Sequence, residues 1–160
     1  MRNEDYVMTT QQRSSSQERL STSAAPWSQL LREETLRIEE TGVGAAIASI
    51  RLSNADERTH RQVVGLLGRL LGPTDTFNVA DTGLITVLIA PSPGIVELSA
   101  RMTSLESRLV ELGCAPLLGY AIRRRDESLL DTLARSDASV DRARARQAGS
   151  ASVIVLPQDD

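Results

Sequence analysis

The sequence has no lysine, a single cysteine and only four aromatic residues. Without lysine, neither a P-loop phosphate clamp nor a lysine Schiff base can operate. Cys114 alone can form no internal disulfide and no cysteine cluster for zinc, so we expect a reducing, cytoplasmic location. The scarcity of aromatic side chains leaves few platforms on which single-stranded nucleic acid could stack.

The sequence also lacks an excess of charge of either sign. Its 18 basic and 21 acidic residues leave a net charge of −3, which is too balanced to indicate a general affinity for nucleic acid or anionic lipid. No apolar run approaches the roughly 18 to 20 residues that span a bilayer. We therefore expect neither nucleic acid nor a membrane among the partners of this protein.

Apolar residues are plentiful enough for one core, because 41% of the 160 residues are hydrophobic. Residues 1–24 are rich in Ser, Thr, Gln and Arg. Such a segment buries too little apolar surface to offset its ordering entropy, so a disordered tail is predicted there. Residues 25–41 are predicted to form an N-terminal helix or linker, and residues 42–157 a single folded domain.

The spacing of apolar residues predicts four helices, at residues 26–40, 58–71, 95–112 and 126–148. Short apolar runs predict five strands, at residues 43–52, 76–79, 84–89, 115–122 and 151–156. The order is one helix followed by β-α-β-β-α-β-α-β, which contains the split-βαβ, ferredoxin-like pattern. We therefore expect an α+β fold with helices on one or both faces of a mixed sheet.

The second and third predicted strands meet at Asp81-Thr82-Gly83, which is typical of a hairpin turn. The element order around this turn resembles the diguanylate cyclase (GGDEF) domain family, from about residue 30 to residue 156. In this resemblance the family's signature turn corresponds to Asp81, Thr82, Gly83, Leu84 and Ile85. The resemblance implies the ferredoxin-like core of the nucleotidyl cyclases, with an N-terminal helix and an extra C-terminal helix and strand.

Further landmarks carry the same resemblance. The family's Ser-Ile-Gly strand is similar to Leu117-Leu118-Gly119. Its late helix, with Ala-Asp and Ala-Lys pairs, is similar to the segment that contains Ser136-Asp137 and Ala143-Arg144. These landmarks follow one another in the family's order and at its spacing.

The chemistry of the resembled family depends on carboxylates. They hold a divalent metal that activates the attacking hydroxyl and neutralises charge on the triphosphate. The resemblance places the first-strand acids at Arg51 and Ser53 and the two signature acids at Gly83 and Leu84. A guanidinium and an isobutyl group cannot bind magnesium, and Asp81 stands where the family has a glycine. We therefore expect no metal, no cofactor, no catalytic residue and no diguanylate cyclase activity.

A second hypothesis is a nucleotide or cyclic-dinucleotide sensor. It requires a vestigial pocket formed by Arg51, Asp75 and Asp81. In the resemblance, Asp75 occupies the Asp position of the family's Arg-x-x-Asp product site, but Gly72 stands at the Arg position. This alternative would make the chain a ligand-binding protein without turnover.

The predicted helix at residues 26–40 carries an apolar edge of Trp27, Leu30 and Leu31. In the resembled family, the corresponding helix often connects a sensor to the cyclase domain and mediates dimerisation. Here the edge can dock on its own domain, pair with a second subunit in a homodimer or bind another protein. The leading hypothesis is a catalytically inactive, GGDEF-like regulatory or scaffolding module of bacterial signalling that acts through protein-protein contacts.

Overall fold

Strand β3 (Ala46–Ser53) is the central strand of the molecule, and its first five residues are all buried. A run of small and branched apolar residues suits a strand that is covered on both faces. The computed structural model describes residues 5–9, 19–21, 25–53, 56–80, 83–145 and 152–155. Within these residues β3 pairs antiparallel with β5 (Leu84–Ile89) on one side and with β6 (Ala115–Ile122) on the other.

The sheet has seven strands in the order β2-β1-β4-β5-β3-β6-β7. Strand β4 (Thr76–Val79) forms a hairpin with β5. Strand β7 (Ser152–Val155) runs parallel to β6, and the other neighbouring pairs are antiparallel. The sheet is therefore mixed, as the sequence predicts.

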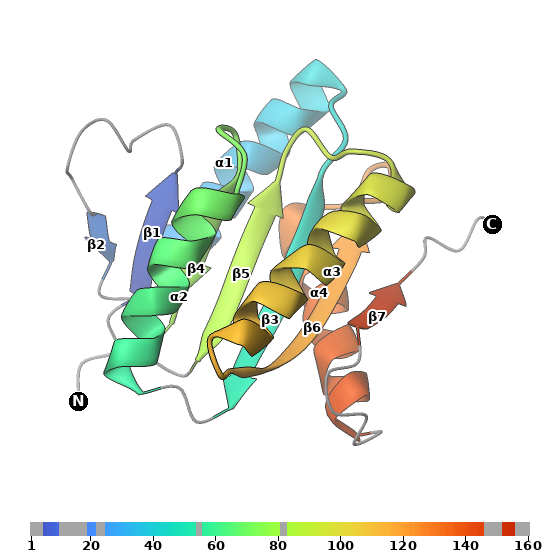
Figure 1. The fold of residues 1–160 in the computed structure, drawn as a ribbon. Coiled ribbons are helices and arrows are strands. Elements are labelled where there is room, and N and C mark those ends of the chain that lie inside the picture. Colours follow the sequence, from blue (N-terminus) through green and yellow to red (C-terminus); the bar gives the residue numbers. More distant parts are fainter. Residues whose placement is uncertain are drawn as a thin grey trace.

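Helices cover both faces of the sheet (Figure 1). Helices α2 (Glu57–Leu70) and α3 (Ile95–Glu111) lie in front of the sheet in this view, and α1 (Ala25–Thr41) and α4 (Leu129–Ala145) lie behind it. The helices and strands from α1 to β7 follow the predicted order, with bounds that differ from the predicted ones by a few residues. The α+β, ferredoxin-like architecture with an N-terminal helix and an extra C-terminal helix and strand is confirmed.

The alternation of side chains along β3 divides the interior into two cores. Ala46, Ala48 and Ile50 belong to the core that α2 and α3 cover, whereas Ile47 belongs to the core beneath α1. On the α1 side the core consists of Trp27, Leu31, Ile38, Ala45, Ile47, Leu88 and Leu129. The scarcity of aromatic residues does not limit these cores, because aliphatic side chains fill most of both.

Helix α4 packs unusually close to β6 at Gly119. A Cβ added to Gly119 would lie 2.9 Å from the Cβ of Ser139 and 3.0 Å from the carbonyl oxygen of Ser136. The hydroxyl of Ser136 donates a hydrogen bond to the carbonyl oxygen of Gly119 at 3.2 Å. Small residues on both elements therefore set the distance between helix and sheet.

Within the predicted disordered tail of residues 1–24, the structure differs from the prediction at residues 5–9 and 19–21, and the other residues of the tail lie outside the described part of the chain. Residues Asp5–Thr9 form β1, which pairs antiparallel with β4, and residues Arg19–Ser21 form β2, which pairs with β1. The physical reason is the open edge of β4, whose backbone groups offer hydrogen bonds to any extended segment. Composition could not reveal this edge, because the edge exists only in the folded sheet.

Candidate functional site

The end of β3 and the β4–β5 hairpin meet at one edge of the fold. Arg51 is paired with Leu84 in the sheet register, and the backbone N–H of Leu52 donates to the carbonyl oxygen of Gly83 at 2.9 Å. The hairpin closes through a hydrogen bond from the N–H of Gly83 to the carbonyl oxygen of Ala80 at 3.1 Å. The predicted hairpin is thus present, although Asp81 and Thr82 at its tip lie outside the described residues.

Glycine is the only residue type that suits position 83. Its φ of +77° lies in the left-handed region that favours glycine. A Cβ at Gly83 would also lie 2.9 Å from the carbonyl oxygen of Leu52, a contact that real Cβ atoms avoid. A carboxylate therefore cannot stand at position 83 unless the hairpin moves away from β3.

Arg51 lies on the face of the sheet that α4 covers. Its guanidinium forms an ion pair with Asp141 of α4 at 3.1 Å. Nearby, Ser49 donates a hydrogen bond to the carboxylate of Asp137 at 2.5 Å. Burial raises the pKa of Asp137, and the hydrogen bond from Ser49 and the charge of Arg51 only partly oppose this shift. Arg51 is thus part of the interface between the sheet and α4.

The described side chains at this edge do not supply the ligands that a divalent metal ion requires. A magnesium site needs several oxygen ligands, of which carboxylates are the strongest. The positions that the sequence resemblance assigns to the acids hold Arg51, Ser53, Gly83 and Leu84. Asp56, the next described acid after β3, caps α2 by accepting a hydrogen bond from the N–H of Thr59 at 2.7 Å. No group of three His, Cys, Asp or Glu residues suited to a metal is found in the part of the chain that the structure describes.

Asp75 lies at the end of the sheet opposite to the β4–β5 hairpin, where other residues of the chain bind its side chain. The side chain is 3% exposed and accepts hydrogen bonds from the N–H of Gly72 at 2.7 Å and from Arg101 of α3 at 2.5 Å. The next residue, Thr76, is paired with Leu88, whereas Arg51 is paired with Leu84. The structure therefore does not bring Arg51 and Asp75 together, and the predicted shared pocket is wrong for these two residues. Asp81, its third predicted member, lies outside the described residues.

The apolar edge of α1 is buried within its own domain. Trp27 is 4% exposed and Leu31 is completely buried, and Leu30 packs against the same core. Of the three alternatives for this edge, the structure selects docking on the chain's own sheet. The alternative in which Trp27, Leu30 and Leu31 form a partner-binding surface does not hold for the described structure, because these side chains cover Ile47 and Leu88.

Comparison with solved structures identifies the fold. A microbial GGDEF domain that interacts with cyclic di-GMP superposes with a TM-score of 0.73 at 15% identity, over 82% of this chain and 92% of that chain. The GGEEF domain of a diguanylate cyclase from Vibrio cholerae superposes with a TM-score of 0.71 at 11% identity, over 81% and 94%. The chain has the GGDEF fold. The GGDEF domain of DgcB from Caulobacter crescentus, in complex with cyclic di-GMP, gives a TM-score of 0.67 at 17% identity, over 81% and 88%.

Comparisons by sequence identify no related protein. No protein-family model matches the chain, and no curated protein matches it. The GGDEF fold is thus visible in the arrangement of elements and not in the residues of the signature. None of the described helices is long and apolar enough to cross a membrane.

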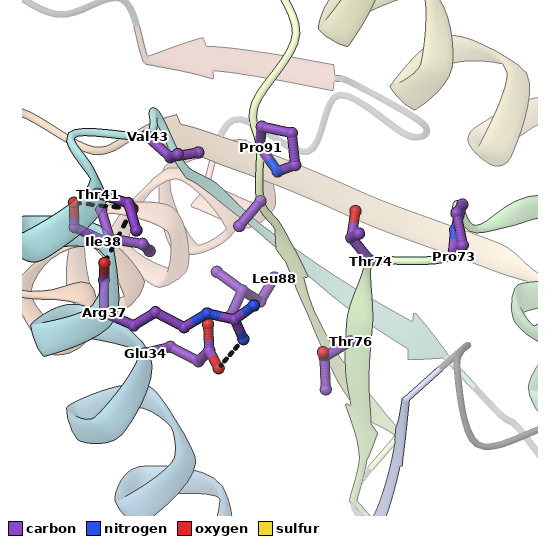
Figure 2. A pocket seen from close by; sticks show the side chains of 11 residues that line it. Glu34, Arg37, Ile38, Thr41, Val43, Pro73, Thr74, Thr76, Leu88 and Pro91 are labelled. Atoms are coloured by element: carbon purple, nitrogen blue, oxygen red, sulfur yellow. Dashed lines mark hydrogen bonds and ion pairs between the residues drawn. The ribbon is translucent and has the colours of Figure 1, made fainter.

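A cavity of about 380 Å³ lies on the α1 side of this GGDEF fold, away from the hairpin (Figure 2). Glu34 and Arg37 reach into it from α1 and form an ion pair of 3.3 Å, while Thr76 lines the opposite wall. Sequence reasoning missed this cavity. Its walls come from α1, the start of β4 and the end of β5, and no motif links these three segments.

A polar cluster joins β6 to α4 on the same side of the fold. Arg135 binds both carboxylate oxygens of Glu127, at 2.7 and 2.6 Å, and also donates to the carbonyl oxygen of Ile122. Burial alone would raise the pKa of Glu127, but the hydrogen bonds from Arg135, Arg124 and Thr132 lower it below its ordinary value. This cluster serves the structure of the loop, because its charges are paired with one another.

Proposed function

We propose that this chain is a catalytically inactive GGDEF-like module that acts in bacterial signalling through protein-protein contacts, as a regulatory or scaffolding component in the cytoplasm. The observation that carries the proposal is the chemistry where β3 meets the hairpin. A guanidinium, a hydroxyl, a glycine and an isobutyl group stand where the resembled cyclases hold their metal ligands. These groups cannot neutralise the charge of a triphosphate through a bound divalent cation.

The electrostatics of this edge also support the proposal. Arg51 is a permanent cation that would repel a divalent metal ion placed beside it. Its charge is already directed to Asp141 of α4, so a nucleotide would have to compete with an ion pair within the protein. The close contact between Gly83 and Leu52 opposes the simplest route back to an acidic signature.

Proteins with this fold do assemble with protein partners. The diguanylate cyclase SiaD from Pseudomonas aeruginosa, solved in complex with its activator SiaC, superposes with a TM-score of 0.61 at 15% identity, over 82% of this chain and 57% of that chain. A GGDEF fold can thus belong to a chain that binds a protein regulator. We propose that the present chain also binds a protein partner but does not catalyse the formation of a cyclic dinucleotide.

The test is an assay for cyclic dinucleotide formation with purified protein, GTP and either magnesium or manganese. The active GGEEF domain from Vibrio cholerae serves as the positive control. We expect product from the control and none above background from this chain. Product formation that scales with the concentration of this chain, under either metal, would overturn the proposal.

Calorimetry with GTP and with cyclic di-GMP separates the module from a sensor. We expect no saturable heat from either ligand. Saturable binding that is lost in Arg51→Ala but kept in Arg124→Ala, an exposed arginine on the loop after β6, would replace the proposed role by ligand sensing. Circular dichroism of both variants shows whether a lost signal reflects a lost fold.

A further inference from the structure

The cavity between α1 and the sheet is large enough for a small molecule. Its volume of about 380 Å³ lies within the roughly 300–1,000 Å³ of typical ligand sites. Its apolar lining consists of the side chains of Ile38, Val43, Pro73, Leu88, Ala90 and Pro91. Ile38 is 3% exposed and Leu88 is 1% exposed, so both belong to the packed core. The apolar part of the cavity therefore exists before any ligand arrives.

A buried hydroxyl group faces this cavity. Thr76 lies beside Leu88, because the two residues are paired in the sheet. Its side chain is only 7% exposed, and Figure 2 shows its hydroxyl oxygen directed into the cavity. No other described residue forms a hydrogen bond with this hydroxyl. Since a buried polar group without a partner costs free energy, a ligand that brings a polar group to Thr76 is favoured.

The wall opposite Thr76 carries one charge of each sign. Glu34 and Arg37 lie one turn apart on α1, and their charged groups approach to 3.3 Å in the cavity (Figure 2). The side chain of Glu34 is 27% exposed and that of Arg37 is 73% exposed. Water screens a pair in this position, so it stabilises the fold little and can be exchanged for the charges of a ligand. Among the described lining residues no other is charged, and the lining as a whole is neutral.

These features match a small zwitterion with an aliphatic body. A ligand with a single charge would take one partner of the ion pair and leave the other without compensation. In an α-amino acid the ammonium and the carboxylate are attached to the same carbon, so they can meet Glu34 and Arg37 together. The planar guanidinium also suits a carboxylate. A peptide or an ω-amino acid holds its two charges too far apart for such a closely spaced pair.

We propose that this cavity binds a free α-amino acid with an aliphatic side chain. The carboxylate of the ligand pairs with Arg37 and accepts a hydrogen bond from Thr76, its ammonium pairs with Glu34, and its side chain packs on Leu88. The ligand thus connects α1 with β4 and β5. The proposal goes beyond the proposed function and does not rest on it, because the cavity lies away from the hairpin.

Isothermal titration calorimetry of the full chain tests the proposal, with leucine, isoleucine and valine as probes. We expect saturable binding of at least one of them. Leucinamide lacks the carboxylate and N-acetylleucine lacks the ammonium, so each is expected to bind at least about tenfold more weakly than leucine. The same loss is expected for 6-aminohexanoate, whose charges stand at opposite ends. If none of the amino acids binds at millimolar concentration, or if 6-aminohexanoate binds equally well, the proposal is overturned.

Substitutions on α1 test the two charges. Arg37→Gln and Glu34→Gln are each expected to weaken binding of the amino acid at least about tenfold. The matched controls are Arg32→Gln and Glu33→Gln, which remove the same charges from exposed positions of α1 that do not line the cavity. The controls are expected to keep the wild-type affinity. An affinity that all four changes reduce alike, or that none of them reduces, would contradict the assignment.

Thr76 supplies a test of the buried hydroxyl. Thr76→Val keeps the shape of the side chain and is expected to weaken binding about two- to tenfold, whereas Thr76→Ser keeps the hydroxyl and is expected to restore it. Equal affinities of the two variants would show that the hydroxyl does not contact the ligand. Circular dichroism confirms that each variant is folded.

Nuclear magnetic resonance locates the bound amino acid. The ligand is expected to shift the amide signals of Thr76 and Leu88, which line the cavity, and to leave that of Gly83 in the hairpin unchanged. Shifts at Gly83 without shifts at Thr76 and Leu88 would place the ligand elsewhere and refute the site.

Discussion

The carbonyl oxygen of Leu52 lies against the backbone of Gly83, so that a Cβ on Gly83 would lie 2.9 Å from it. This contact ties the hairpin to the end of β3, together with the hydrogen bond from the N–H of Leu52 to the carbonyl oxygen of Gly83. The contact joins the end of β3 to the hairpin, and both of these segments would have to contribute to the active site of a cyclase. The contact therefore has consequences for stability and for attempts to restore acidic residues.

Gly83→Ala is expected to destabilise the fold through two separable effects. The left-handed conformation costs a non-glycine residue about 1–2 kcal/mol, and the clash with Leu52 adds about 1–3 kcal/mol of overpacking. The control is Gly113→Ala, because Gly113 has a φ of +81° but open space around its Cβ position. Urea unfolding should show a larger loss for Gly83→Ala; equal losses would mean that the contact with Leu52 costs nothing.

Gly119→Ala is expected to push α4 away from β6. The added methyl group meets the backbone and Ser139 within 3.0 Å, so the free energy of unfolding falls by about 1–3 kcal/mol. Gly65→Ala in α2 is the matched control. Its Cβ would lie 3.5 Å from the guanidinium of Arg69, and the helix preference of alanine favours it by roughly 0.8–1 kcal/mol. The two changes should therefore shift the thermal midpoint in opposite directions.

Leu31→Ala tests whether α1 belongs to the domain. Because Leu31 is completely buried, we expect a loss of about 2–5 kcal/mol from the transfer and cavity terms. Leu36→Ala on the exposed side of the same helix should change the stability by no more than about 0.5 kcal/mol. Chemical denaturation measures both. If α1 were a detachable linker, the two substitutions would have the same small effect.

Glu127→Gln tests the polar cluster through its pH dependence. The pKa of Glu127 is lowered in the folded state from an ordinary value of 4.5, so its carboxylate stabilises the fold above that pH. We expect the substitution to cost about 1–3 kcal/mol near neutral pH, where charged hydrogen bonds are lost. The difference from the wild type should shrink as the pH falls below 4.5. Glu40→Gln, at an exposed residue of α1, controls for the loss of one acidic charge.

The ionisation of Asp137 should have the opposite effect on the stability of the fold. Burial raises its pKa above the ordinary 3.8, so the unfolded chain loses this proton at a lower pH than the folded chain does. The ionised side chain therefore costs stability at neutral pH, and the cost disappears as the pH falls through this raised pKa. Asp137→Asn, which keeps an acceptor for Ser49, removes this pH dependence. The free energies of unfolding of the wild type and the variant are measured across the acidic pH range. Parallel curves would contradict this expectation.

Much of the fold could be read from the sequence because local signals and tertiary contacts agree. The strands 76–79, 84–89 and 115–122 have the predicted bounds, and the spacing of apolar residues gave α3 almost to the residue. These segments are bounded by turn or breaker residues such as Gly83 and Gly113, whose positive φ angles explain their positions. In these cases the local preference and the packing require the same backbone.

The candidate site was predictable only in part, because its contacts join distant segments. The sequence resemblance indicated which positions meet where β3 meets the hairpin, but it could not reveal that Arg51 pairs with Asp141 or that Asp75 pairs with Arg101. The same limit applies to α1, where an apolar edge suits self-docking and partner binding equally well. Only the packed structure shows that Trp27 is covered.

The pairing of β1 with β4 also affects how the protein folds during synthesis. Tyr6 is paired with Val79, so β1 leaves the ribosome well before its neighbour β4 and can pair with it only after β4 has followed. Contacts between segments so distant in sequence slow folding, because a large loop must close before they form. During synthesis β1 therefore stays without its neighbour in the sheet, and accessible to chaperones, until β4 has been translated.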